Sequence, residues 1–158
     1  MKRHLAVFFV SSLSAFAEPT LQDAVSDFQA GDLVAAKVIL EGLAVKEPKN
    51  QAVQNYLRLV AERQAGEVAM RKKLNAVIIP KLELSDADSK QAFDFICQLI
   101  NKNGGFRPNL VWMVPPGSDK KITLSLDNIP GAEAMRYAAE SAGLKLLFEE
   151  HAVRVKPE

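Results

Sequence analysis

Residues 122–155, ITLSLDNIPGAEAMRYAAESAGLKLLFEEHAVRV, contain the signals of a strand, a helix and a hairpin in close succession. From Ile122 to Asp127 apolar and polar residues alternate, which is typical of a strand with one buried face. Pro130 suits the first position of a helix, and Gly143 suits its end. The apolar face of this helix is predicted from residues at helical spacing: Ala132, Met135, Ala138, Ala139 and Ala142.

The residues after this helix predict a terminal β-hairpin. Leu146 and Phe148 occupy alternate positions, and Val153 and Val155 resume the alternation. Between them, residues 149–151 are polar and provide the turn. The stretch therefore reads strand, helix, strand, strand.

A strand, helix and strand are also predicted ahead of this stretch. Residues 77–84 form the first strand, in which Pro80 favours an edge position or a bulge because proline donates no ladder hydrogen bond. Asp88 and Gln91 have the spacing of a capping box at a helix start. The helix is expected to end at residues 103–105, and its apolar face is predicted to comprise Ala92, Phe95, Ile96, Leu99 and Ile100. The second strand has alternating apolar residues: Leu110, Trp112 and Val114.

This pattern resembles the short N-terminal domain of secretins and TonB-dependent transducers. The matching features are an alternating strand, a proline-started helix that carries an alanine, a Gly-Leu step and a terminal hairpin. Here they are Leu124, Leu126, Pro130, Ala134, Gly143, Leu144, Val153 and Val155. The resemblance covers residues 77–158 and implies two helices between two small sheets. Gly131 stands where that family has a large apolar residue.

The segment 18–61 predicts two antiparallel helices followed by the start of a third. One apolar stripe is found before the Gly31-Asp32 turn and another after it. The spacing resembles the second half of a tetratricopeptide repeat and the beginning of the next, through Gly31, Leu33, Ala36, Leu40 and Pro48, and then Ala52, Tyr56 and Val60. A peptide groove needs about three stacked repeats. We therefore expect these helices to pack against the C-terminal domain, a partner or a second copy.

Residues 62–76 are polar, favour a helix and contain Gly66, so they predict a connecting helix between two modules. The fold class predicted for the whole chain is α+β. A repeat-like helical hairpin is joined by this connecting helix to the domain of residues 77–158.

Residues 1–17 have the pattern of a secretory signal peptide. A basic start precedes an apolar run, and Ala15 and Ala17 give a small-x-small cleavage site before Glu18. The alternative is a membrane span, but the apolar run is shorter than the roughly 20 residues that a span needs. We therefore expect an exported protein, in the periplasm or associated with the outer membrane, with no stable membrane span after cleavage.

The composition excludes several classes of function. The 20 basic and 19 acidic residues nearly balance, so nucleic acid is not an expected partner. Cys97 has no second cysteine to pair with and is predicted to be buried. After cleavage His151 is the single histidine, which leaves no basis for a triad or a multi-histidine metal site. We therefore predict no catalytic, metal-binding or cofactor-binding residues and a chain that is not an enzyme.

Two functional hypotheses remain from the sequence. The first is an adaptor that binds other envelope proteins, such as components of a secretin, pilus or outer-membrane transport assembly, or a second copy of itself. Its predicted binding surface is the terminal strand at Val153, Arg154 and Val155, taken as a sheet edge open to strand addition. The alternative is a small-ligand or glycan-binding domain, with Trp112 and Tyr137 as stacking residues.

Overall fold

The computed structural model describes residues 18–118 and 120–158. The predicted signal peptide, with Ala15 and Ala17, lies outside the described residues. Among the helices of the described residues, none combines the length and the apolar composition of a membrane-spanning segment. The elements follow in the order α1 (Leu21–Ala30), α2 (Leu33–Lys46), α3 (Gln51–Asn75), β1 (Ile78–Asp88), α4 (Ser89–Gly104), β2 (Leu110–Trp112), β3 (Lys121–Pro130), α5 (Gly131–Ala142), β4 (Leu144–Phe148) and β5 (Val153–Pro157). The predicted α+β class is confirmed.

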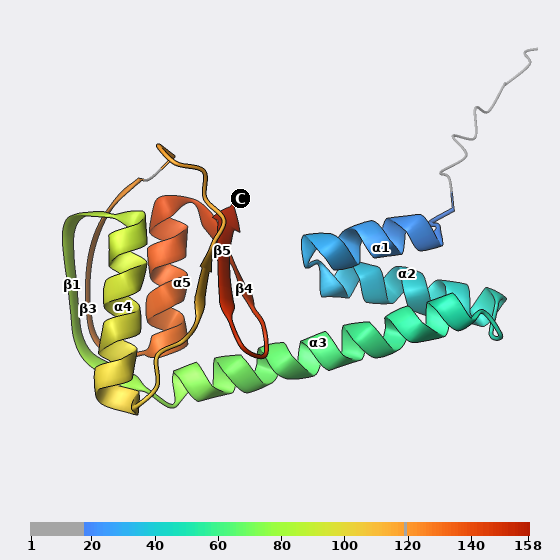
Figure 1. Ribbon diagram of the computed structural model, residues 1–158, viewed down its shortest axis with the longest axis horizontal. Helices are drawn as coiled ribbons and strands as arrows, with labels where there is room; N and C mark the ends of the chain where they lie inside the picture. The colour runs from blue at the N-terminus through green and yellow to red at the C-terminus, as the bar shows by residue number, and fades with distance from the viewer. Residues whose placement is uncertain (1–17, 119) are drawn as a thin grey trace, which may run out of the picture.

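The first two helices pack side by side, with α3 against them (Figure 1). Thr20 caps α1 through a capping box with Asp23, in which the backbone N–H of Thr20 donates to Oδ2 of Asp23 over 2.8 Å. Gly31 ends α1 with a φ of 84°, a left-handed conformation that glycine adopts without a Cβ clash. The small core of this helical module contains five buried residues: Ala24, Ala36, Leu40, Val53 and Val60.

Helix α3 is continuous over 25 residues, about 37 Å at 1.5 Å per residue. Val60 packs into the helical module and Met70 and Leu74 pack into the core of the sheet domain, so one helix joins both (Figure 1). The predicted boundary between residues 61 and 62 falls inside this helix. Gly66 does not interrupt it, because one glycine costs a helix only about 1 kcal/mol and packing on both sides holds the helix in place.

The C-terminal domain contains two small sheets. In the first, β1 and β3 pair antiparallel; in the second, the strand order is β2-β5-β4, with β2 parallel and β4 antiparallel to β5. Figure 1 shows α4 and α5 side by side between these sheets. Pro80 lies in β1, which has one strand neighbour, as expected for a proline in a strand. The register of β1 and β3 shifts between Leu84 and Ala87, where Asp86 has a φ of 49°.

The apolar face predicted for α4 is partly wrong. Phe93 is fully buried and Cys97 is 1% exposed, whereas Phe95 is 40% exposed and Leu99 is only partly buried. Ile96 and Ile100 belong to both possible faces, and packing against α5 and β1 decides between them. The buried face comprises Ala92, Phe93, Ile96, Cys97 and Ile100.

The predicted capping box at the start of α4 is also wrong. Asp88 is the N-cap residue, but its side chain makes no capping hydrogen bond. Its carboxylate instead pairs with Lys121 over 2.9 Å, across the β1–β3 ladder. Cys97 is buried as predicted, and this burial raises the pKa of its thiol to about 11.

Helix α5 begins at Gly131, one residue after the predicted start at Pro130. Its five predicted face residues are all buried. A Cβ atom at position 131 would lie 3.0 Å from Cγ1 of Ile100 and 3.0 Å from the carbonyl oxygen of Leu74. A glycine here therefore lets the start of α5 approach both α4 and the end of α3.

Candidate functional site: a cleft beside the β4–β5 hairpin

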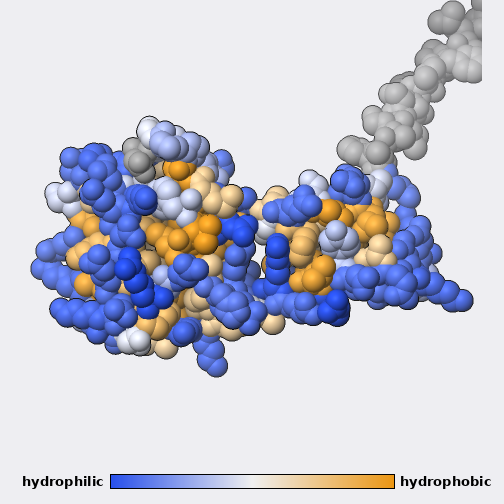
Figure 2. Space-filling view, in the orientation of Figure 1, coloured by the Kyte–Doolittle hydropathy of each residue, from blue (hydrophilic) through white to orange (hydrophobic). Residues whose placement is uncertain are grey.

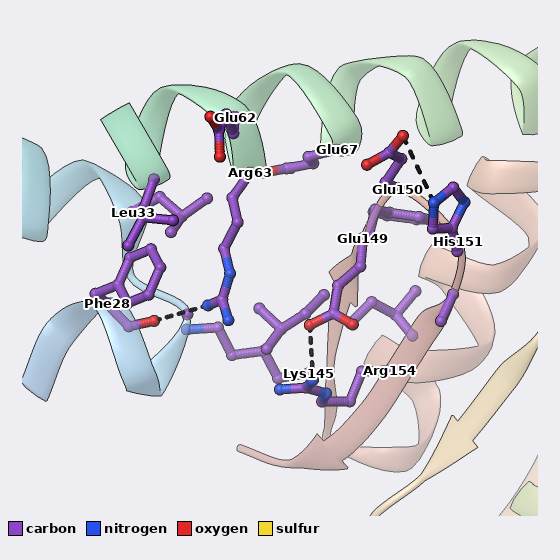
Figure 3. A pocket seen from close by; sticks show the side chains of 16 residues that line it. Phe28, Leu33, Glu62, Arg63, Glu67, Lys145, Glu149, Glu150, His151 and Arg154 are labelled. Atoms are coloured by element: carbon purple, nitrogen blue, oxygen red, sulfur yellow. Dashed lines mark hydrogen bonds and ion pairs between the residues drawn. The ribbon is translucent and has the colours of Figure 1, made fainter. Parts of the chain in front are cut away.

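A cleft of about 700 Å³ lies between the α1–α2 corner, α3 and the β4–β5 hairpin (Figure 3). The helical corner forms one wall, the hairpin forms the opposite wall, and α3 runs along the cleft. Segments far apart in the sequence therefore share one surface. The lining residues are Phe28, Gly31, Leu33, Leu59, Glu62, Arg63, Glu67, 145–152 and Arg154.

Three close approaches hold the walls in place. A Cβ atom at Gly31 would lie 2.8 Å from Cδ1 of Leu147, so the helical corner touches the hairpin there. Nζ of Lys156 donates a hydrogen bond over 2.8 Å to the carbonyl oxygen of Ala30, close to the same point. The third approach is between Gly66 and the hairpin turn, described below. Both ends of the hairpin wall are thus fixed against helices.

Arg63 connects α3 to the end of α1 at one side of the cleft. Its NH1 group donates to the carbonyl oxygen of Phe28 over 3.1 Å, and its guanidinium carbon lies 4.1 Å from the centroid of the Phe28 ring. The last carbonyls of a helix carry partial negative charge, and an aromatic ring face attracts a cation, so both contacts favour the guanidinium. Arg63 therefore presents a positive charge next to an apolar ring.

The hairpin side of the cleft has charges of both signs. Arg154 NH2 lies 2.7 Å from Oε1 of Glu149, and both side chains are about one-third exposed. Nε of Arg154 is buried and finds no hydrogen-bond partner among the described residues. At the turn, Nε2 of His151 is 3.6 Å from Oε1 of Glu150, and both side chains are largely exposed. Leu147 and Phe28 also line the cleft, which therefore combines an apolar surface with a charged rim.

The structure corrects the prediction that the terminal strand is an edge. β5 is the central strand of its sheet, between β2 and β4, and Val153 and Val155 are fully buried. The alternation of side chains predicts which residues face the core, but it does not specify which strands are neighbours. Of the three predicted binding residues, Arg154 alone lines the cleft.

Trp112 and Tyr137 lie apart from the cleft. Trp112 is half-buried in β2, and its ring centroid is 5.8 Å from that of Phe93. Tyr137 is 38% exposed on α5, where the guanidinium of Arg136 covers its ring at 4.2 Å. Trp112 thus packs against the core of the sheet domain, and neither ring lines the cleft.

Within the described residues, no group of three or more His, Cys, Asp and Glu side chains is placed to hold a metal ion.

Leu59 and Arg63 had no signal in the sequence that marked them as site residues. They become part of a site because α3, which contains both residues, passes the hairpin.

Comparisons of the chain with protein-family models, with curated proteins and with solved structures found no match. The resemblance of residues 77–158 to the short N-terminal domain of secretins and TonB-dependent transducers therefore remains a hypothesis. The same is true of the tetratricopeptide-like character of α1 and α2.

We expect Gly66→Ala to destabilise the protein, although alanine is the better helix former. A Cβ atom at this position would lie 2.8 Å from Cβ of Glu150 and 3.2 Å from its Cα and backbone nitrogen. Backbone atoms cannot rotate away, so the hairpin turn must move off α3. The loss from overpacking is about 1–3 kcal/mol and outweighs the roughly 1 kcal/mol gained in helix propensity.

Chemical denaturation measures this balance, with Gly42→Ala as the matched control. Gly42 is also inside a helix, but a Cβ atom there would have no neighbour within 4 Å. The free energy of unfolding of Gly42→Ala is therefore expected to rise by up to about 1 kcal/mol. Equal gains in both variants would show that the hairpin turn does not rest on α3.

Proposed function

We propose that this chain is a non-catalytic adaptor of the cell envelope that binds an extended segment of another protein in the cleft. The observation that supports it is the composition of the cleft wall: apolar side chains from α1, α2, α3 and β4 lie beside charged groups. Protein-binding sites commonly combine an apolar centre with a polar rim. β4, which lines the cleft from Lys145 to Phe148, is an outer strand of its sheet. An extended segment is therefore the shape of partner that suits this wall.

The charges of the cleft indicate the chemistry of that segment. Glu62 pairs with Arg58, and Glu67 pairs with Arg71, so these two carboxylates are already matched. Glu149 is matched in the same way by Arg154, and Glu150 lies 3.6 Å from Nε2 of His151 at the turn. Arg63 and Lys145 line the cleft and form no ion pair within residues 18–118 and 120–158. We infer that the bound segment carries apolar side chains together with at least one carboxylate.

The envelope location in this proposal comes from the sequence. Residues 1–17 have the signal-peptide pattern, and residues 77–158 resemble a domain of secretins and TonB-dependent transducers. Both features suit a partner within a secretin, pilus or outer-membrane transport assembly. A shared fold alone does not define function, so the partner must be captured at the cleft itself.

Photo-crosslinking in the native envelope tests the proposal. A photoreactive residue at Leu59, which is 37% exposed and lines the cleft, should capture a discrete partner that mass spectrometry identifies. The matched control is Val68, which is 66% exposed on the same helix but does not line the cleft. Leu59→Glu should reduce recovery of that partner about tenfold or more, by placing a charge on the apolar surface. Val68→Glu should leave it unchanged; equal effects of the two would contradict binding in the cleft.

A further inference from the structure

Helix α2 is apolar on two opposite faces. Ala36 and Leu40 are fully buried against α1 and α3, while Val34, Val38 and Val45 are 70%, 65% and 84% exposed. At about 100° per residue these three valines fall within about 40° of one another, on the side of the helix opposite the buried pair. Figure 2 shows apolar residues at the surface of the helical module.

A helix with apolar residues on both faces is normally covered on both. Single exposed apolar residues are common on protein surfaces, but here three lie along one line. Valine is also a weaker helix former than the residues usual at exposed helical positions, so helix stability does not account for the choice. The outer face of α2 thus has the composition of a contact surface.

The charges beside this face suit a second copy of the chain. Lys37 and Glu41 lie along one flank of the three valines, 3.8 Å apart as an ion pair with both side chains about half-exposed. When a helix packs antiparallel on a copy of itself about a two-fold axis, each flank lies opposite the same flank of the other copy. With that axis near residue 39, Lys37 faces the second copy's Glu41, and Val34 faces the second copy's Val45. In a parallel pair the flank of Lys37 and Glu41 would instead meet the other flank, which carries Lys46, already paired with Glu18 over 2.7 Å, and no acidic residue of α2 itself.

We propose that the outer face of α2, formed by Val34, Val38 and Val45, is a self-association surface on which two copies of this chain pack antiparallel. The inference is independent of what the cleft binds, because none of these residues lines the cleft. One helical face from each copy is smaller than a standard interface of about 1,600 Å². The dimer is therefore expected to be concentration-dependent.

Analytical ultracentrifugation of the protein beginning at Glu18, from about 5 µM to about 500 µM, measures the association. A monomer–dimer equilibrium is expected. Val38→Glu should weaken it about tenfold or more by placing two carboxylates in the apolar contact, with circular dichroism confirming the fold. Val68→Glu, an equally exposed valine of α3, should leave it unchanged. A monomer at every concentration, or equal effects of the two variants, would overturn the proposal.

Charge exchange tests the antiparallel arrangement. Lys37→Glu and Glu41→Lys each place like charges opposite one another and should each weaken the dimer about tenfold. The double variant restores opposite charges in both cross-copy pairs and should recover the wild-type association. Both side chains are exposed, so these substitutions are expected to leave the fold intact. Failure of the double variant to recover association would overturn the two-fold arrangement.

Discussion

Replacing Phe93 by alanine is expected to lower the free energy of unfolding by about 3–5 kcal/mol. The side chain is fully buried on α4, among residues of the larger core, and its ring lies near Trp112. Truncation removes the apolar contacts of a whole ring and leaves a cavity that the surrounding helices and strands cannot fill. Chemical denaturation followed by Trp112 fluorescence measures the loss.

Phe95→Ala is the matched control, because the same side chain is removed two positions further along the same helix. Phe95 is 40% exposed, so its loss is expected to be below about 1 kcal/mol. The pair of variants also decides which face of α4 is buried. A larger loss at Phe95 than at Phe93 would restore the face expected from the sequence and contradict the packing described above.

The difference between these two phenylalanines shows what the sequence of α4 left open. Ile96 and Ile100 predict a helix with one buried stripe, and that much is confirmed. Phe93 with Cys97 completes the stripe on one side, and Phe95 with Leu99 completes it on the other. Periodicity alone gives both choices nearly equal support. The position of α5 and β1 selects one, and this information is not local to the helix.

The sequence predicts the order of strands and helices along the chain better than it predicts which strands pair with one another. The alternation around Ile122 and the Gly143 stop predicted β3, α5 and the following hairpin, and all are present. The pairing of β5 with β2 joins residues more than 40 positions apart, and no pattern within either strand encodes it. Because of this long-range pairing, β5, which was expected at a sheet edge, lies at the centre of its sheet.

The cleft could not be predicted, because it depends on a helix that crosses an expected boundary. Polar residues and Gly66 predict only a connecting helix between two modules at residues 62–76, whereas in the structure this glycine is where α3 meets the hairpin turn. Phe28 belongs to the apolar stripe before the Gly31-Asp32 turn, but its contact with Arg63 follows from the tertiary structure alone.

Val153→Pro is expected to unfold the sheet domain of residues 77–158 at denaturant concentrations that leave the wild type folded. The backbone N–H of Val153 donates a hydrogen bond over 2.8 Å to the carbonyl oxygen of Asn109, at the junction of β2 and β5. Proline has no N–H group, so the carbonyl oxygen of Asn109 loses its hydrogen-bond donor. The proline ring also fixes φ away from the values of an extended strand. At a fully buried position of a central strand the combined loss is expected to exceed about 3 kcal/mol.

Val153→Ala separates the backbone from the side chain, because alanine keeps the N–H group and loses only buried methyl groups. Its loss of stability should be smaller than that of the proline variant. Binding of a cleft partner should disappear in Val153→Pro together with the near-ultraviolet signal of the folded domain, since the hairpin wall depends on β5 for its pairing. An outer strand would behave differently: the proline variant would keep wild-type stability and lose only its partner. That result would contradict the central position of β5 and favour strand addition at Val153 and Val155.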